Sequence, residues 1–107
     1  MNGYLVTFYV QQNHRHHGKP LADWLMQLPR ELELPGATQM PATAGIGRHH
    51  HLHSSRFFEL TDQTLLIDMA VTQEQCARLF AHLEAECAKL FYVRTAVEFG
   101  VLGEMAS

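Results

Sequence analysis

The chain has 107 residues, 47% of them hydrophobic, and this length predicts a single domain, residues 1–107, with one core. The 8 Lys and Arg against 11 Asp and Glu give a formal net charge of −3, which argues against non-specific electrostatic binding to nucleic acid or to an anionic membrane. No stretch approaches the ~20 apolar residues of a membrane-spanning helix, and no signal peptide is apparent, so we expect a cytoplasmic protein without direct membrane insertion.

The chain begins with a predicted strand, a loop and a helix. Residues 4–10 (YLVTFYV) are β-branched and aromatic, which is typical of a strand, and a polar loop over residues 11–19 follows. From Pro20 the apolar residues recur at i, i+3, i+4, i+7 and i+11, which predicts a helix. A proline inside this pattern predicts a kink or a restart of the helix at Leu28–Pro29.

A weak strand and a long loop come next. Pro35-Gly36 is expected to end the helix. Residues 37–44 predict a weak strand, and Pro41 restricts that strand to a sheet edge, because a central strand would lose a ladder hydrogen bond there. Residues 45–56 (GIGRHHHLHSSR) then form a loop rich in Gly and His.

The second half of the chain repeats this order. Residues 57–60 and 64–71 predict a strand interrupted or extended around the intervening polar residues. A Thr-x-x-Gln capping box at residues 72–75 opens a second helix over residues 73–88, and residues 90–99 alternate as a half-buried strand. The predicted buried residues are Leu65, Ile67, Met69 and Val71 in the strand, and Cys76, Leu79, Phe80, Leu83 and Cys87 in the helix.

The two cysteines, Cys76 and Cys87, are expected to be buried reduced thiols. On a helix over residues 73–88 they would lie about 16 Å apart along the axis, which is too far for a disulfide bond.

The order β-α-β-β-α-β predicts an α+β, ferredoxin-like fold: a four-stranded antiparallel sheet with two helices on one face. With the spatial strand order 4-1-3-2, three connections meet at one end of the sheet: residues 11–19, residues 45–56 and the turn at Ala88-Lys89. These connections carry seven of the eight His, together with Lys19, Arg48, Arg56 and Lys89. We therefore expect a cationic, His-rich rim on an otherwise acidic protein.

The rim offers the groups of an anion site. Gly45 and Gly47 allow the backbone to approach a ligand closely, and successive N–H groups there can form an anion nest. Lys19 and Lys89 would supply point charges for phosphate, and Arg48 or Arg56 a planar guanidinium. A flexible hairpin tip without a ligand is the alternative.

The imidazoles leave other interpretations open. His16, His51 and His53 suit a divalent transition metal such as Zn, Ni, Cu or Fe. However, no Cys, Asp or Glu lies within residues 47–56, and a closed structural zinc site needs four protein ligands. Solvated loop imidazoles, or a docking surface that responds to pH, are the alternatives.

Catalysis and RNA binding find little support. Ser54 and Ser55 lie near His residues, but no acidic orienter is close in sequence and no strand-turn-helix elbow is visible, so we expect no enzyme activity. The RNA recognition motif shares the order of elements, but its basic, Gly and aromatic signature is absent from residues 64–71. We expect no nucleic-acid partner.

An ordered set of short motifs resembles a known family over nearly the whole chain. The motifs are His16-x-Gly18-Lys19-Pro20-Leu21, Gly36-Ala37-Thr38, Gly45-x-Gly47 with His51-x-His53, and Phe57-Phe58-x-Leu60. Together they are similar to the PII-like family called domain of unknown function 190.

The resemblance implies a homotrimeric, cytoplasmic PII-like signalling protein with effector sites in the clefts between subunits. The 45–56 loop corresponds to the T-loop of PII proteins, which would contact a transporter or an enzyme. The effector would be a small anion, most plausibly an adenine nucleotide, and no cofactor would be required. The expected ligand-binding residues are Lys19, Gly45, Gly47, Arg48, His51, His53 and Lys89. The alternative is a His-rich divalent-metal-binding or metal-tolerance protein of the same fold, with His16, His51 and His53 as the metal ligands.

Overall fold

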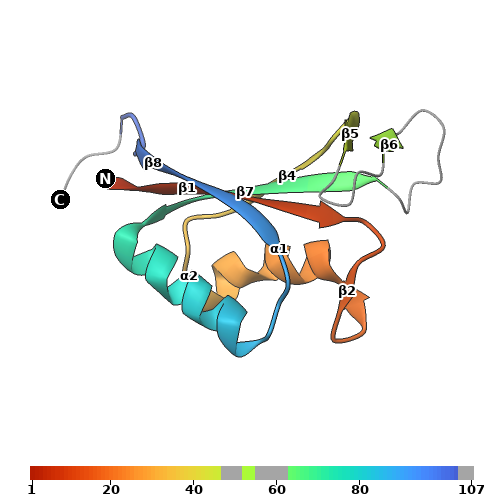
Figure 1. The fold of residues 1–107 in the computed structure, drawn as a ribbon. Coiled ribbons are helices and arrows are strands. Elements are labelled where there is room, and N and C mark those ends of the chain that lie inside the picture. Colours follow the sequence, from red (N-terminus) through yellow and green to blue (C-terminus); the bar gives the residue numbers. More distant parts are fainter. Residues whose placement is uncertain (47–51, 55–62, 104–107) are drawn as a thin grey trace.

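The computed structural model describes residues 1–46, 52–54 and 63–103. Its main sheet has four antiparallel strands in the order β4-β7-β1-β8. These strands are β1 (Asn2–Gln11), β4 (Thr38–Pro41), β7 (Thr64–Thr72) and β8 (Phe91–Glu98). The helices α1 (Leu21–Leu32) and α2 (Gln73–Ala85) both cover one face of the sheet (Figure 1). The ferredoxin-like fold, the strand order and the edge position of Pro41 are confirmed.

Two short hairpins lie beyond the main sheet, within the predicted loops. The first pairs β2 (Arg15–His16) with β3 (Lys19–Pro20), and the second pairs β5 (Ala44–Ile46) with β6 (Leu52–Ser54). Both hairpins extend from the same end of the sheet (Figure 1). The predicted strand at residues 57–60 lies outside the described residues.

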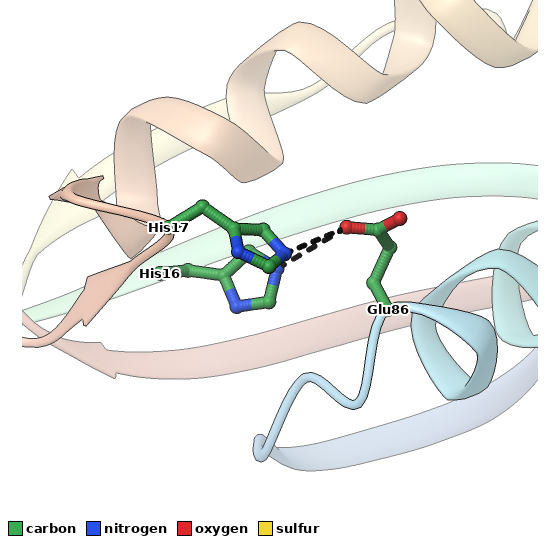
Figure 2. A group of neighbouring side chains, drawn as sticks. All are labelled: His16, His17 and Glu86. Carbon is green, nitrogen blue, oxygen red and sulfur yellow. Dashed lines mark hydrogen bonds and ion pairs between the residues drawn. The ribbon is translucent and has the colours of Figure 1, made fainter.

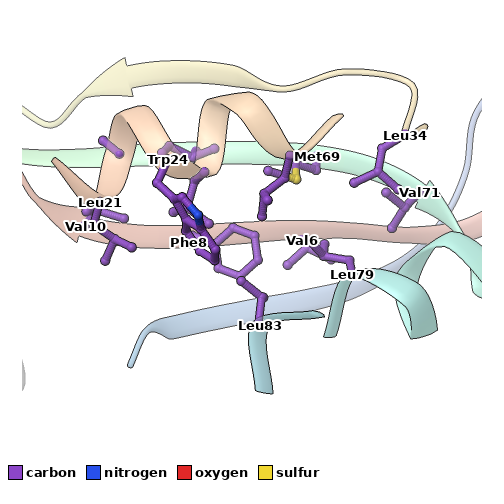
Figure 3. Close-up of a cluster of buried hydrophobic side chains, with 14 of the residues drawn as sticks. Val6, Phe8, Val10, Leu21, Trp24, Leu34, Met69, Val71, Leu79 and Leu83 are labelled. Carbon is purple, nitrogen blue, oxygen red and sulfur yellow. The ribbon is translucent and has the colours of Figure 1, made fainter. Parts of the chain in front are cut away.

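The core lies between the sheet and the two helices. The alternate residues predicted for β7 are all buried, and β1 contributes Val6, Phe8 and Val10 from the same face (Figure 3). The predicted capping box is present: the Thr72 hydroxyl accepts from Gln75 N–H at 3.2 Å, and the Gln75 side chain accepts from Thr72 N–H at 2.9 Å. Of the described residues, neither helix is long and apolar enough to span a membrane.

The predicted restart at Leu28–Pro29 is wrong, because α1 continues unbroken to Leu32. Proline removes only the backbone donor of position 29, and its own carbonyl still accepts from the N–H of Glu33, so the helix continues past it. Glu33 caps the helix: its N–H donates to the Pro29 carbonyl, and its left-handed backbone (φ 56°) directs the next N–H, that of Leu34, to the same carbonyl at 2.9 Å. The helix therefore ends just before Pro35-Gly36.

The prediction that both cysteines are buried holds for Cys76 and is wrong for Cys87. Both are free thiols, as expected. The helix α2 ends at Ala85, and Cys87 adopts a left-handed conformation (φ 54°) beyond it. The apolar stripe of the helix therefore stops before Cys87, which is exposed.

The strand β8 is more exposed than the predicted half-buried strand. It is an edge strand, and α2 covers only part of its inner face. On that face, the Tyr92 ring lies 4.8 Å from Phe80 and the Arg94 guanidinium lies 4.9 Å from the centre of the Tyr4 ring. Phe91 and Val93 alternate with these residues and therefore lie on the face of the sheet that no helix covers.

Candidate functional site

The strands place three connections at one end of the sheet, as predicted. Gln11, the last residue of β1, pairs with Thr64, the first residue of β7, and Tyr9 pairs with Phe91, the first residue of β8. The strand β4 ends at Pro41 beside the start of β7. We call the three connections that leave this end the rim: residues 12–20, 42–63 and 86–90.

The structure locates only some of the predicted site residues. Lys19 lies in β3, where its Nζ donates to Gln27 Oε1 at 2.8 Å, and Lys89 is exposed between α2 and β8. Gly45 and His53 are paired across the β5–β6 hairpin. The remaining predicted ligand-binding residues, Gly47, Arg48 and His51, lie outside the described residues.

The rim contains a close group of three side chains, His16, His17 and Glu86 (Figure 2). Nε2 of His17 lies 3.0 Å from Glu86 Oε1, and Nε2 of His16 lies 3.6 Å from the same oxygen. The nearest nitrogen or oxygen atoms of the three residues are all within 4.8 Å of one another. His16 Nε2 is buried and makes no hydrogen bond. We call this group the His-Glu cluster.

The β2–β3 turn explains why two consecutive imidazoles face one carboxylate. Successive side chains of an extended strand point to opposite sides. Here His17 and Gly18 form the two-residue turn, and both have positive φ, 51° and 80°. The left-handed conformation of His17 brings its ring to 4.1 Å from the ring of His16. Arg15 supports the turn by donating from its guanidinium to the Gly18 carbonyl at 3.0 Å.

The ring of Trp24, on α1, packs against His16 and covers one side of the cluster. It lies 4.3 Å from the ring of His16 and stacks on His82 of α2 at 5.8 Å with an interplanar angle of 19°. Trp24 is buried, and the side chain of His16 is only 12% exposed. The side chain of His17 is 66% exposed, so the cluster has one closed side and one side open to solvent.

The charge state of Glu86 follows from these neighbours. Partial desolvation raises the pKa of its carboxyl group, but the hydrogen bond with His17, the nearby His16 and the electrostatic influence of His17 and His82 lower it, and the net shift is downward. Glu86 is therefore ionised near neutral pH. This carboxylate lies at the C-terminal end of α2, where the partial negative charge of the helix disfavours it and a cation is preferred.

Sequence reasoning missed Glu86 and did not pair His16 with His17. The structure brings His16 to His17 and Glu86, whereas the predicted set of His16, His51 and His53 is not tested. The signal for Glu86 was present, because an acidic residue at the end of a predicted helix is atypical. Its convergence with the β2–β3 turn depends on tertiary packing.

The uncovered face of the sheet carries a row of apolar side chains at the rim end. Met40 pairs with Leu66, Leu66 with Tyr9, and Tyr9 with Phe91, so the row crosses all four strands. Met40, Tyr9 and Phe91 are 41%, 39% and 44% exposed. We call these four residues the open-face row. Exposed apolar side chains beside unpaired strand edges are typical of surfaces through which proteins associate.

Comparisons with known proteins agree with the architecture. The family model DUF190, Uncharacterized ACR, matches residues 3–99. CPII, a nitrogen regulatory PII-like protein from Thiomonas intermedia K12 bound to ADP, AMP and bicarbonate, superposes with a TM-score of 0.69 at 15% identity, covering 94% of this chain and 91% of that one. A Thermus thermophilus protein assigned as a PII-like signaling protein superposes with a TM-score of 0.65 at 19% identity, covering 91% and 88%. At these identities the likeness shows the fold.

Proposed function

The chain belongs to the DUF190 family of PII-like proteins, and from this membership we propose that it is a regulator that binds an adenine nucleotide at the rim. The observation that carries the proposal is the convergence of the rim's three connections. Both lysines of the chain, Lys19 and Lys89, lie on these connections. Ammonium groups of this kind bind phosphate as point charges.

The fold neighbour CPII binds ADP, AMP and bicarbonate, which supports an anionic effector for a protein of this fold. In the free protein the Lys19 ammonium is held by Gln27, a neutral acceptor that a phosphate would replace with a stronger, charge-assisted bond. Arg48 and the backbone of Gly45 and Gly47 would complete the anion site, with His51 and His53 contacting the ligand or shaping the loop.

The proposed assembly is a homotrimer with the effector sites between subunits. The open-face row supplies the apolar contact, and a second copy of the chain is a natural occupant because the row ends at the exposed edge strands β4 and β8. Packing the row of one subunit near that of the next would place the rims close to the subunit boundary.

Signalling would occur without chemistry. The effector would bind one conformation of the 45–56 loop better than another and so shift the loop toward it. A transporter or an enzyme would bind only one of these loop conformations. The extent of that response is limited by the difference in affinity between the two loop conformations.

We expect the double variant Lys19→Ala, Lys89→Ala to bind ADP or AMP more than ~100-fold more weakly than the natural sequence, because two charge-assisted contacts are removed at about 1.5–3 kcal/mol each. Isothermal titration at fixed ionic strength measures the change. The control is Arg30→Ala, which removes a positive charge from the exposed far end of α1. Equal affinities of the double variant and the control would place the nucleotide elsewhere.

A further inference from the structure

We propose that the His-Glu cluster is a binding site for a divalent transition-metal ion, with His16 Nε2, His17 Nε2 and a Glu86 carboxylate oxygen as its three protein ligands. The ion would join the β2–β3 turn to the C-terminal end of α2, two segments that are nearly 70 residues apart in the chain. This inference goes beyond the nucleotide proposal and does not rest on it.

The spacing of the three atoms matches what a tetrahedral ion requires. With metal–ligand bonds of about 2.0–2.1 Å at tetrahedral angles, neighbouring ligand atoms lie about 3.3 Å apart. The two nitrogen–oxygen distances in the cluster are 3.0 and 3.6 Å, on either side of that value. All ligand atoms are within 4.8 Å of one another. Side-chain rotations that move these atoms by at most about 1.5 Å would therefore bring them to the tetrahedral spacing.

Each of the three residues of the His-Glu cluster departs from the usual preference for its position in the chain. His17 adopts a left-handed conformation in a turn that favours Asn or Gly, and Glu86 places a carboxylate at a helix C-terminus. His16 Nε2 is buried without a hydrogen bond. A cation bound between the three side chains satisfies the nitrogen, neutralises the carboxylate and complements the helix. Such coincident departures from local preference are typical of functional sites.

The ligand set selects the class of ion. Two imidazoles and one carboxylate are the donors of zinc sites that keep an open coordination position, and imidazole also suits Ni²⁺, Cu²⁺ and Fe²⁺. Calcium and magnesium prefer all-oxygen ligands. The exposed side chain of His17 leaves solvent access for water or a small anion as the fourth ligand. Trp24 packs against His16 on the closed side and restricts the orientation of its ring.

Zn²⁺ titration of metal-stripped protein, in buffer without nucleotide, tests the site. Two variants remove one ligand each with little effect on the fold: His17→Asn retains a residue suited to positive φ, and Glu86→Gln is isosteric. Each is expected to weaken the binding of one Zn²⁺ equivalent more than tenfold, since even changes to residues that only support a metal ligand lower metal affinity about 10–100-fold. His14→Ala is the matched control, because His14 lies in the same connection but outside the cluster. The paired variant His51→Ala, His53→Ala controls for the other imidazoles.

The only tryptophan of the chain gives a local readout. Co²⁺ bound at the cluster would lie next to the ring of His16, whose centre is 4.3 Å from that of Trp24, and would quench its fluorescence. Saturable quenching near one equivalent is expected in the natural sequence and in His14→Ala, and is expected to disappear in His17→Asn and Glu86→Gln.

The proposal is overturned if His17→Asn and Glu86→Gln bind Zn²⁺ as the natural sequence does. It is also overturned if only the His51, His53 variant loses the metal, or if Co²⁺ leaves the Trp24 fluorescence unchanged. Because no nucleotide is present, these results are independent of whether the rim binds one.

Discussion

Replacing Met40 and Phe91 with glutamate is expected to convert the proposed homotrimer into a monomer. Both residues belong to the open-face row, on the edge strands β4 and β8, and are 41% and 44% exposed in the single chain. In the trimer each substitution would bury an unpaired carboxylate, and the desolvation penalty is about several kcal/mol per ion. Since about 1.4 kcal/mol is a factor of ten, the dissociation constant should rise more than ~100-fold.

Size-exclusion chromatography with light scattering measures the mass directly against the 12.2 kDa of one chain. The matched control is Met26→Glu, which introduces the same charge at a methionine of α1 that is 36% exposed and lies on the helical side of the molecule. It should leave the trimer intact. A monomeric natural protein, or a double variant that stays trimeric, would contradict the proposed assembly.

Replacing Gly3 with alanine is expected to destabilise the fold by about 3 kcal/mol, the upper part of the usual range for forcing extra volume into a packed interior. Gly3 is buried in β1, between Thr72 of β7 and Val97 of β8. An added Cβ would overlap the carbonyl oxygen of Val71 and lie 2.8 Å from Cα of Thr72. These are backbone atoms of a central strand, so relief requires the strands to separate.

Chemical denaturation at equal protein concentration measures this loss. Gly100→Ala is the control, because a Cβ there meets nothing within 4 Å and the residue has no positive φ. A Gly3→Ala protein as stable as the Gly100→Ala protein would mean that β1 and β7 tolerate a wider separation at this end.

The fold could be predicted because local signals and the global arrangement agree. The alternation of Leu65, Ile67, Met69 and Val71 identified the buried face of β7, and the Thr72 capping box marked the start of α2. The edge position of β4 followed from Pro41, whose missing N–H is tolerated only there. These features depend on near neighbours in the chain.

The failures depend on tertiary packing. In β8 the alternation of residues predicted a half-buried strand, but Phe91 and Val93 lie on the face that no helix covers and are exposed. Periodicity shows that a strand has two faces and does not show which one is covered. The exposure of Cys87 depends on one left-handed residue beyond α2, which no repeat in the sequence indicates.

The candidate site was predicted in outline. The topology correctly placed the end of β1, the end of β4 and the start of β8 at one end of the sheet. It did not predict that His17 would turn toward Glu86, because that contact joins a tight turn to the end of a distant helix. The roles assigned to Lys19, Lys89 and the residues of 45–53 stay predictions.

The most direct test of the central claim is thermal denaturation of the metal-stripped protein with AMP, ADP or ATP added separately at fixed ionic strength. If the rim binds an adenine nucleotide, at least one of the three should raise the melting temperature in a saturable way. A nucleotide at about 100 times its Kd should stabilise the protein by about 2.7 kcal/mol. An unchanged melting temperature with all three nucleotides at millimolar concentration would contradict the proposed function.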